Sequence, residues 1–210
     1  AKQLKDQEKQ DKKDALRLAK TLKEQEKLDK IKEREEAKRL KEQEKQDKIK
    51  EKLGGHVYSL TPDFGDAGAN PNLIAAEKYD ELVKAHVMFK DMDADPYLKS
   101  AGIANDWPYG RGCYQSEDKQ RIIWFGEEDQ LRIMCMKKGQ FLNEVFNNLK
   151  ELLDIVESID GIDFAVSEKY GAVTSCPTNL GTGMRASVHI YNTDEELDRF
   201  VAALRPLAAG

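Results

Sequence analysis

Hydrophobic positions follow a helical period in parts of the chain after residue 72, and short β-rich runs stand between those parts. Residues 140–159 place apolar side chains three and four positions apart, which predicts an amphipathic helix. Residues 73–90 are spaced similarly, and a capping box at Thr193–Glu196 predicts a helix within residues 191–210. Short β-rich runs alternate with these helices, at Arg121–Phe125, Leu131–Met136, Gly171–Cys176 and Arg185–Ile190. This order predicts an α+β fold with a largely antiparallel sheet flanked by helices.

The first 53 residues contain few apolar positions, and their sequence repeats. Lys23–Glu33 (KEQEKLDKIKE) recurs as Lys41–Glu51 (KEQEKQDKIKE), a period of 18 residues or five whole helical turns. Helix formers dominate and opposite charges stand four positions apart, so we expect a long charged α-helix ahead of the folded part. Because no heptad seam is sustained, three interpretations stay open: a solvated single helix, a weak coiled coil or partner-bound helix, and a disordered segment.

Composition divides the chain near residue 53. Charged residues make up 35% of the 210 residues, and the formal net charge is −5. Residues 1–53 carry 19 basic and 14 acidic side chains, whereas the remainder carries 15 and 25. We therefore expect four parts: a charged helical repeat over residues 1–53, a Gly-, Asn- and Pro-rich linker over 54–72, a folded domain over 73–190 and a C-terminal amphipathic helix over 191–210.

Charge and cysteine content argue against several classes of partner. Interleaved acids cancel most of the field of the basic repeat, so no nucleic-acid partner is expected. No stretch approaches the ~20 apolar residues of a membrane span, so no membrane partner is expected either. The three cysteines lack CxxC spacing, which predicts neither a disulfide framework nor a protein metal site and favours a reducing, cytoplasmic setting.

Two clusters carry chemistry. The run Cys176–Ile190 (CPTNLGTGMRASVHI) places a thiol, a small-residue loop and then Arg185, and loop N–H groups with an arginine suit a polyphosphate. The run Gly126–Arg132 (GEEDQLR) places carboxylates, which can bind a guanidinium, beside an arginine in one turn. Each residue alone also fits a structural role: a solvated hairpin for the acids, a buried thiol for Cys176, and a hydrogen bond or salt bridge for Arg185 and His189.

Together these runs resemble the phosphagen (guanidino) kinases, the arginine and creatine kinase family, over about Trp107–Ile190, including the WPYGRG segment at 107–112. The resemblance implies an ATP:guanidino phosphotransferase that uses ATP or ADP with Mg²⁺ held through the phosphates. Glu128 resembles the glutamate that orients the small guanidino substrate, such as arginine or creatine, and Cys176 resembles the reactive-site cysteine. The remaining resemblances concern the nucleotide: Arg132 and Arg185 are similar to phosphate-binding arginines, and Ala186, Ser187, Val188 and His189 to the strand packed near it.

The chain also departs from the family pattern. It has no segment like the family's arginine-rich S-T-R-x-R motif, no closing loop after Ile190 and no helical substrate-specificity domain. Gln130 stands where the family has a histidine, and Gly126 where it has an asparagine. A second hypothesis is therefore a non-catalytic, kinase-derived scaffold or docking module tethered by the charged helix, with self-association or a helix-mediated protein partner.

Overall fold

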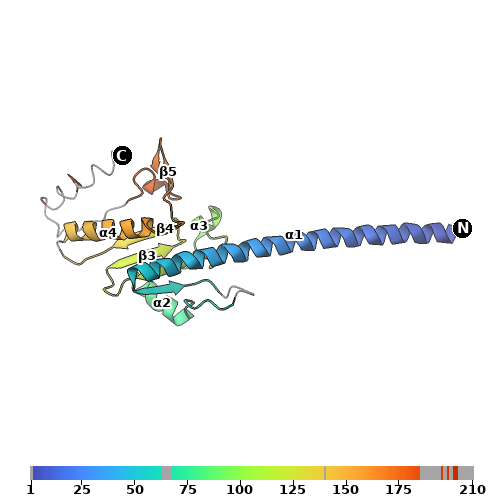
Figure 1. Ribbon diagram of the computed structural model, residues 1–210, viewed down its shortest axis with the longest axis horizontal. Coiled ribbons are helices and arrows are strands. Elements are labelled where there is room, and N and C mark those ends of the chain that lie inside the picture. Colours follow the sequence, from blue (N-terminus) through green and yellow to red (C-terminus); the bar gives the residue numbers. More distant parts are fainter. Residues whose placement is uncertain are drawn as a thin grey trace. The chain divides into compact units, whose positions relative to one another are not determined.

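The computed structural model describes residues 2–62, 68–139 and 141–184, together with residues 195, 198, 201 and 202. The chain forms two compact units, Ala1–Lys41 and Glu42–Gly210. The first unit consists of helix α1, which spans Lys2–Leu53 and continues into the second unit (Figure 1). The predicted long charged helix is therefore confirmed. Of the side chains described in this unit, the large apolar ones are exposed: Leu18, Leu22, Leu28, Ile31 and Leu40.

A four-stranded antiparallel sheet organises the second unit. Its strands are β1 (His56–Ser59), β2 (Gly112–Gln115), β3 (Arg121–Phe125) and β4 (Leu131–Cys135), and they pair in the order β1-β2-β3-β4. Short turns join β2 to β3 and β3 to β4, so consecutive strands are neighbours. The α+β class and the antiparallel sheet predicted from the sequence are confirmed.

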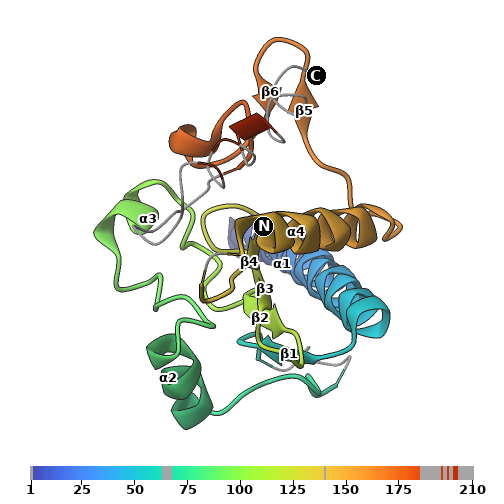
Figure 2. The same ribbon diagram turned by 90° about the vertical axis from the view of Figure 1, so that its left-hand side faces the viewer.

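Alternating side chains of the sheet supply two separate cores, as the pleat requires. Val57, Tyr114 and Ile123 stand opposite one another across β1, β2 and β3, and they face the last turns of α1 and helix α4 (Leu142–Glu157). Cys113 and Ile122 project to the other face. Helices α2 (Ala76–Lys84) and α3 (Pro96–Ser100) lie on that side (Figure 2). Their residues Leu82 and Leu98 contribute to that core.

The last turns of α1 are part of the first core. Ile49 has no exposed surface, Gln46 is 1% exposed, and Leu53 packs against the same cluster. Lys52 Nζ donates hydrogen bonds to the carbonyl oxygen and the hydroxyl of Ser158, at 2.9 and 2.8 Å. The division between compact units therefore falls inside the helix, at residues 41–42, and before the change in composition at residue 53.

The segments around the predicted strands differ from expectation in two places. The expected linker, residues 54–72, contains β1, which forms one edge of the sheet. The strand expected over Gly171–Cys176 is short: β6 covers Gly171–Ala172 and pairs with β5 (Val166–Ser167) in a separate two-stranded sheet. A 3-10 helix, Pro177–Asn179, follows. The predicted strand at residues 185–190 lies outside the described residues, as does most of the predicted C-terminal helix.

Candidate functional site

The turn between β3 and β4 carries the acidic run. The Gly126 N–H donates to the Gln130 carbonyl at 2.9 Å and closes the turn. Gly126 has a φ of +67°, a conformation that glycine and asparagine tolerate best. A Cβ there would lie 2.9 Å from Arg111 Cδ and 3.0 Å from the Gly110 carbonyl oxygen. The glycine thus fits both the conformation and the space, which accounts for its place at the start of this turn.

Arg132, on β4, lies between two of the turn's carboxylates. Its Nη2 donates to Glu128 Oε2 at 3.1 Å and lies 3.2 Å from Glu127 Oε2. The side chains of Arg132 and Glu128 are 36% and 32% exposed, so this guanidinium–carboxylate pair is open to solvent. The structure therefore brings together two of the predicted site residues, and it shows the Glu128 carboxylate binding a guanidinium.

The Trp124 ring packs against the Arg132 guanidinium. The Arg132 Cζ lies 5.3 Å from the centroid of the indole ring, which is a cation–π distance. The indole is itself fixed, because its Nε1–H donates to the Val87 carbonyl at 2.7 Å and its ring meets Phe89 edge-on at 5.4 Å. The second core thus sets the position of the guanidinium on the turn.

The acidic turn contacts the loop that carries the cysteine. The Ser175 N–H donates to the Asp129 carboxylate, and Ser175 immediately precedes Cys176. The Cys176 Sγ lies 3.0 Å from the Thr178 hydroxyl, and the Cys176 carbonyl accepts from the Thr174 hydroxyl at 2.8 Å. The two clusters, far apart in sequence, are therefore joined through Asp129.

The loop after Cys176 uses its N–H groups within the chain. Those of Asn179 and Leu180 donate to the Cys176 and Pro177 carbonyls, at 3.0 and 3.4 Å. The N–H of Gly181 donates to the Ala172 carbonyl at 2.9 Å, and that of Gly183 to the Asn179 carbonyl at 2.8 Å. These four N–H groups are bonded to carbonyls of the chain and do not form the expected binding site for a polyphosphate. Phosphate binding would therefore depend on the arginines.

Glu127 and Asp129 are the residues that the sequence interpretation did not single out. The Glu127 side chain is only 14% exposed, and burial raises the pKa of its carboxyl above the ordinary value. The Glu128 N–H and the charge of Arg132 lower that pKa and offset part of the effect. The sequence alone does not distinguish the three adjacent carboxylates. Their contacts do: Glu127 pairs with Arg132 and is mostly buried, Glu128 pairs with Arg132 and is open to solvent, and Asp129 accepts from the Ser175 N–H.

Of the other predicted residues, Arg185, Ala186, Ser187, Val188 and His189 lie outside the described residues. Within the described ranges, no group of three or more His, Cys, Asp or Glu side chains is arranged to hold a metal ion. The described part of the chain also has no helix long and apolar enough to cross a membrane.

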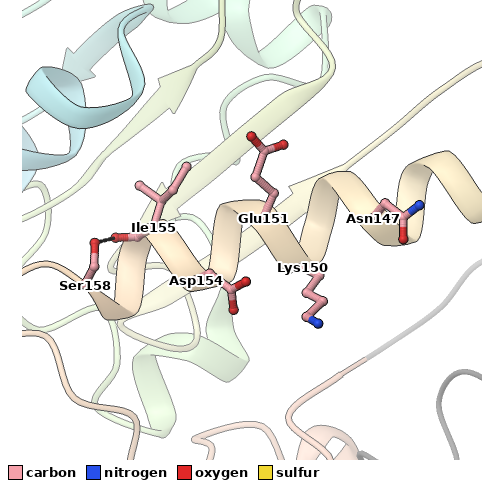
Figure 3. A pocket seen from close by; sticks show the side chains of 6 residues that line it. All are labelled: Asn147, Lys150, Glu151, Asp154, Ile155 and Ser158. Atoms are coloured by element: carbon pink, nitrogen blue, oxygen red, sulfur yellow. Dashed lines mark hydrogen bonds between the residues drawn. The ribbon is translucent and has the colours of Figure 1, made fainter.

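Hollows on the described part of the second unit lie beside the acidic turn and along α4. One, of about 430 Å³, is bordered by Lys45 and Ile49 of α1, by the acidic turn at Asp129 and by Ser175, so it adjoins the candidate site. The other, of about 490 Å³, runs along α4 (Figure 3). Its lining is a set of six side chains on that helix and its C-cap: Asn147, Lys150, Glu151, Asp154, Ile155 and Ser158. It contains none of the predicted site residues, and we assign it no role.

Comparison with known proteins gives the family. Residues 19–192 match the ATP:guanido phosphotransferase C-terminal catalytic domain. An arginine kinase from Anthopleura japonica is 40% identical over 139 residues, which cover 66% of this chain and 19% of the relative. A testis creatine kinase from Oncorhynchus mykiss is 40% identical over 136 residues, covering 63% of this chain and 35% of the relative.

A solved structure agrees with the fold. The duplicated taurocyamine kinase from Schistosoma mansoni, with bound transition state analog components, matches with a TM-score of 0.54 and 30% identity. The match covers 69% of this chain and 19% of that one. The fold is that of a phosphagen kinase catalytic domain. The chain belongs to the ATP:guanido phosphotransferase family, and it spans about a third or less of the length of these curated relatives.

Proposed function

We propose that this chain carries the guanidino-binding part of an ATP:guanidino phosphotransferase. The supporting observation is the Glu128 carboxylate, which accepts a guanidinium hydrogen bond at a solvent-open position on the acidic turn. A substrate guanidinium has the same planar donors as Arg132, so it can bind the same carboxylate. Free arginine, creatine and taurocyamine all present this group.

Glu127 gives Arg132 a second carboxylate partner. When a substrate guanidinium binds Glu128, Arg132 keeps its ion pair with the more buried Glu127 and its place over Trp124. The Arg132 N–H group that Glu128 releases can then donate to a phosphate oxygen of MgATP. The turn would thus hold the substrate and one phosphate contact within a few ångströms.

The transfer itself needs position and charge rather than a covalent intermediate. The bond from the γ-phosphorus to its bridging oxygen breaks, and a bond from that phosphorus to a guanidino nitrogen forms. The nitrogen loses a proton, for which Glu128 is the nearest proposed acceptor, and ADP leaves with the electron pair of the broken bond. We place Cys176 on the guanidino side, because Asp129 binds Ser175 in its loop, and we place Arg185 and the segment through His189 on the nucleotide side. We also place the protein in the cytoplasm, where its three free thiols stay reduced.

The test is phosphoryl transfer from MgATP to arginine, creatine or taurocyamine, with the phosphorus–nitrogen product followed by ³¹P NMR. We expect product from the chain and a loss of at least about 100-fold in rate for Glu128→Gln, which removes the charge but keeps the shape. Glu157→Gln, at the exposed end of α4, is the matched control and should keep the rate. Equal rates for the two variants would refute the role of Glu128.

A specific observation also favours the second function, a non-catalytic docking module. Arg132, the one predicted phosphate-binding arginine among the described residues, is engaged by two carboxylates in this structure. Calorimetry with MgADP separates the two functions, since the docking module binds no nucleotide and the phosphotransferase does.

A further inference from the structure

The two copies of the 18-residue repeat in α1 have different surroundings. In the second copy, Ile49 has no exposed surface and Gln46 is 1% exposed. In the first copy, Ile31 and Leu28 occupy the same positions and are 52% and 50% exposed. A period of 18 residues is five helical turns, so the exposed face of the first copy is the face that the second copy buries.

The second copy packs on a surface formed by the sheet, α4 and the residues next to them. It consists of a set of apolar side chains around Ile49 with a polar group at either end, and we call it the helix-binding surface: Val57, Asn72, Tyr114, Leu152, Val156 and Ser158. Asn72 Nδ2 donates to Asp47 Oδ1 at 3.1 Å. Ser158 accepts from Lys52 at the other end, through its carbonyl and its hydroxyl.

The first copy presents the same three contacts. Asp29 stands 18 residues before Asp47, Ile31 before Ile49, and Arg34 before Lys52. The side chains are already arranged alike: Gln25 Nε2 donates to Asp29 Oδ1 at 2.9 Å, as Gln43 Nε2 donates to Asp47 Oδ1 at 3.0 Å. The first copy therefore offers the same surface an isoleucine, an aspartate and a cation at matching positions.

The two copies differ at positions that face the surface, and the differences have opposite effects on binding: one favours the first copy and the other favours the second. Gln46 is buried with no hydrogen-bond partner for its Oε1, whereas the first copy has Leu28 there, which suits an apolar surface. At the next turn, Leu53 packs against the core and the first copy has Glu35. The second copy is also joined directly to β1, so it binds within its own chain at high effective concentration. Exchange must therefore grow with protein concentration.

We propose that the first repeat of one chain binds the helix-binding surface of a second copy of this chain, in place of that copy's own second repeat. The occupant is a second copy because the chain itself holds both the binding surface and a free version of the sequence that this surface binds. The result is a helix-exchanged dimer in which Asp29 lies against Asn72 of the other chain.

The test begins with sedimentation equilibrium of the full chain over a range of concentrations. We expect a monomer–dimer equilibrium whose dissociation constant rises about tenfold or more in Ile31→Lys, a change at an exposed position of the monomer. Leu22→Lys is the matched control, because Leu22 is exposed on the opposite face of the helix, and it should leave the equilibrium unchanged. Gln46→Leu should lower the dimer fraction, because it improves the competing repeat.

A cross-link checks the contact directly. Chains with Asp29→Cys mixed with chains with Asn72→Cys should form a linked pair between those two positions, identified by mass spectrometry of the peptides. Asp11→Cys is the control, since the faint third copy has Lys13 at the isoleucine position. A chain that stays monomeric, a dimer lost in Leu22→Lys but kept in Ile31→Lys, or equal linkage from residues 11 and 29 would each overturn the proposal.

Discussion

Ile49 and Ile31 form a matched pair for measuring what packing contributes to α1. The two residues have identical neighbours over Asp29–Glu33 and Asp47–Glu51, but Ile49 is fully buried and Ile31 is 52% exposed. We predict that Ile49→Ala destabilises the second unit and that Ile31→Ala does not.

The magnitude follows from burial. Truncating a fully buried isoleucine to alanine removes about 2–5 kcal/mol of unfolding free energy, because a cavity adds to the lost transfer free energy. Alanine is the better helix former by a few tenths of a kcal/mol, and this gain is the same at both positions. The difference between the two variants therefore reports packing alone, and we expect about 3 kcal/mol.

Urea unfolding followed by tryptophan fluorescence measures this difference. Trp107 and Trp124 both pack in the second core, so their emission follows the second unit and not the exposed helix. Repeating the titration at two protein concentrations shows whether dimer formation contributes to the midpoints. Equal midpoints for the two variants would refute the conclusion that α1 belongs to the core from its second repeat onward.

Three further predictions concern the turn and the helix. Gly126→Ala should lower the unfolding free energy by about 1–2 kcal/mol in urea titrations, because φ is +67° there and a Cβ would lie 2.9 Å from Arg111 Cδ. Burial raises the pKa of Glu127, so the folded state holds this proton more tightly and stability falls as pH rises above the ordinary glutamate value of about 4.3. Urea titrations across that range should show a flatter profile for Glu127→Gln, and an unchanged profile would contradict the assignment. Gln46→Leu should raise the unfolding free energy by about 1–2 kcal/mol, since it removes a buried oxygen without a partner, and a lowered melting temperature would contradict this.

The long, strongly periodic elements were predictable from the sequence. Strands β3 and β4 lie in the β-rich runs that predicted them, and helix α4 lies where the helical spacing predicted it. Strands β1 and β2 were not predicted, because four-residue strands beside glycines carry too little pattern to separate them from turns. Their pairing partners, which define them, are distant in the chain.

The site was predictable in its residue types but not in its division of roles. The motif placed Glu128 and Arg132 together, and the structure shows them ion-paired. It could not show that Glu127 is the more buried carboxylate or that Asp129 holds Ser175. Those differences depend on where the β3–β4 turn meets the loop before Cys176, a contact between residues 46 positions apart that no local pattern encodes.

The position of the domain boundary follows from the geometry of the repeat. Composition is uniform across both copies, and the family match begins at residue 19, within α1 and before either copy. The second compact unit, however, begins at Glu42, at the start of the second copy. Because the sequence repeats in whole turns, the face that the second copy buries is also present in the first copy, where Leu28 and Ile31 are exposed. The first copy therefore presents in solvent an isoleucine face like the one that completes the core, and this likeness is the basis of the proposed exchange.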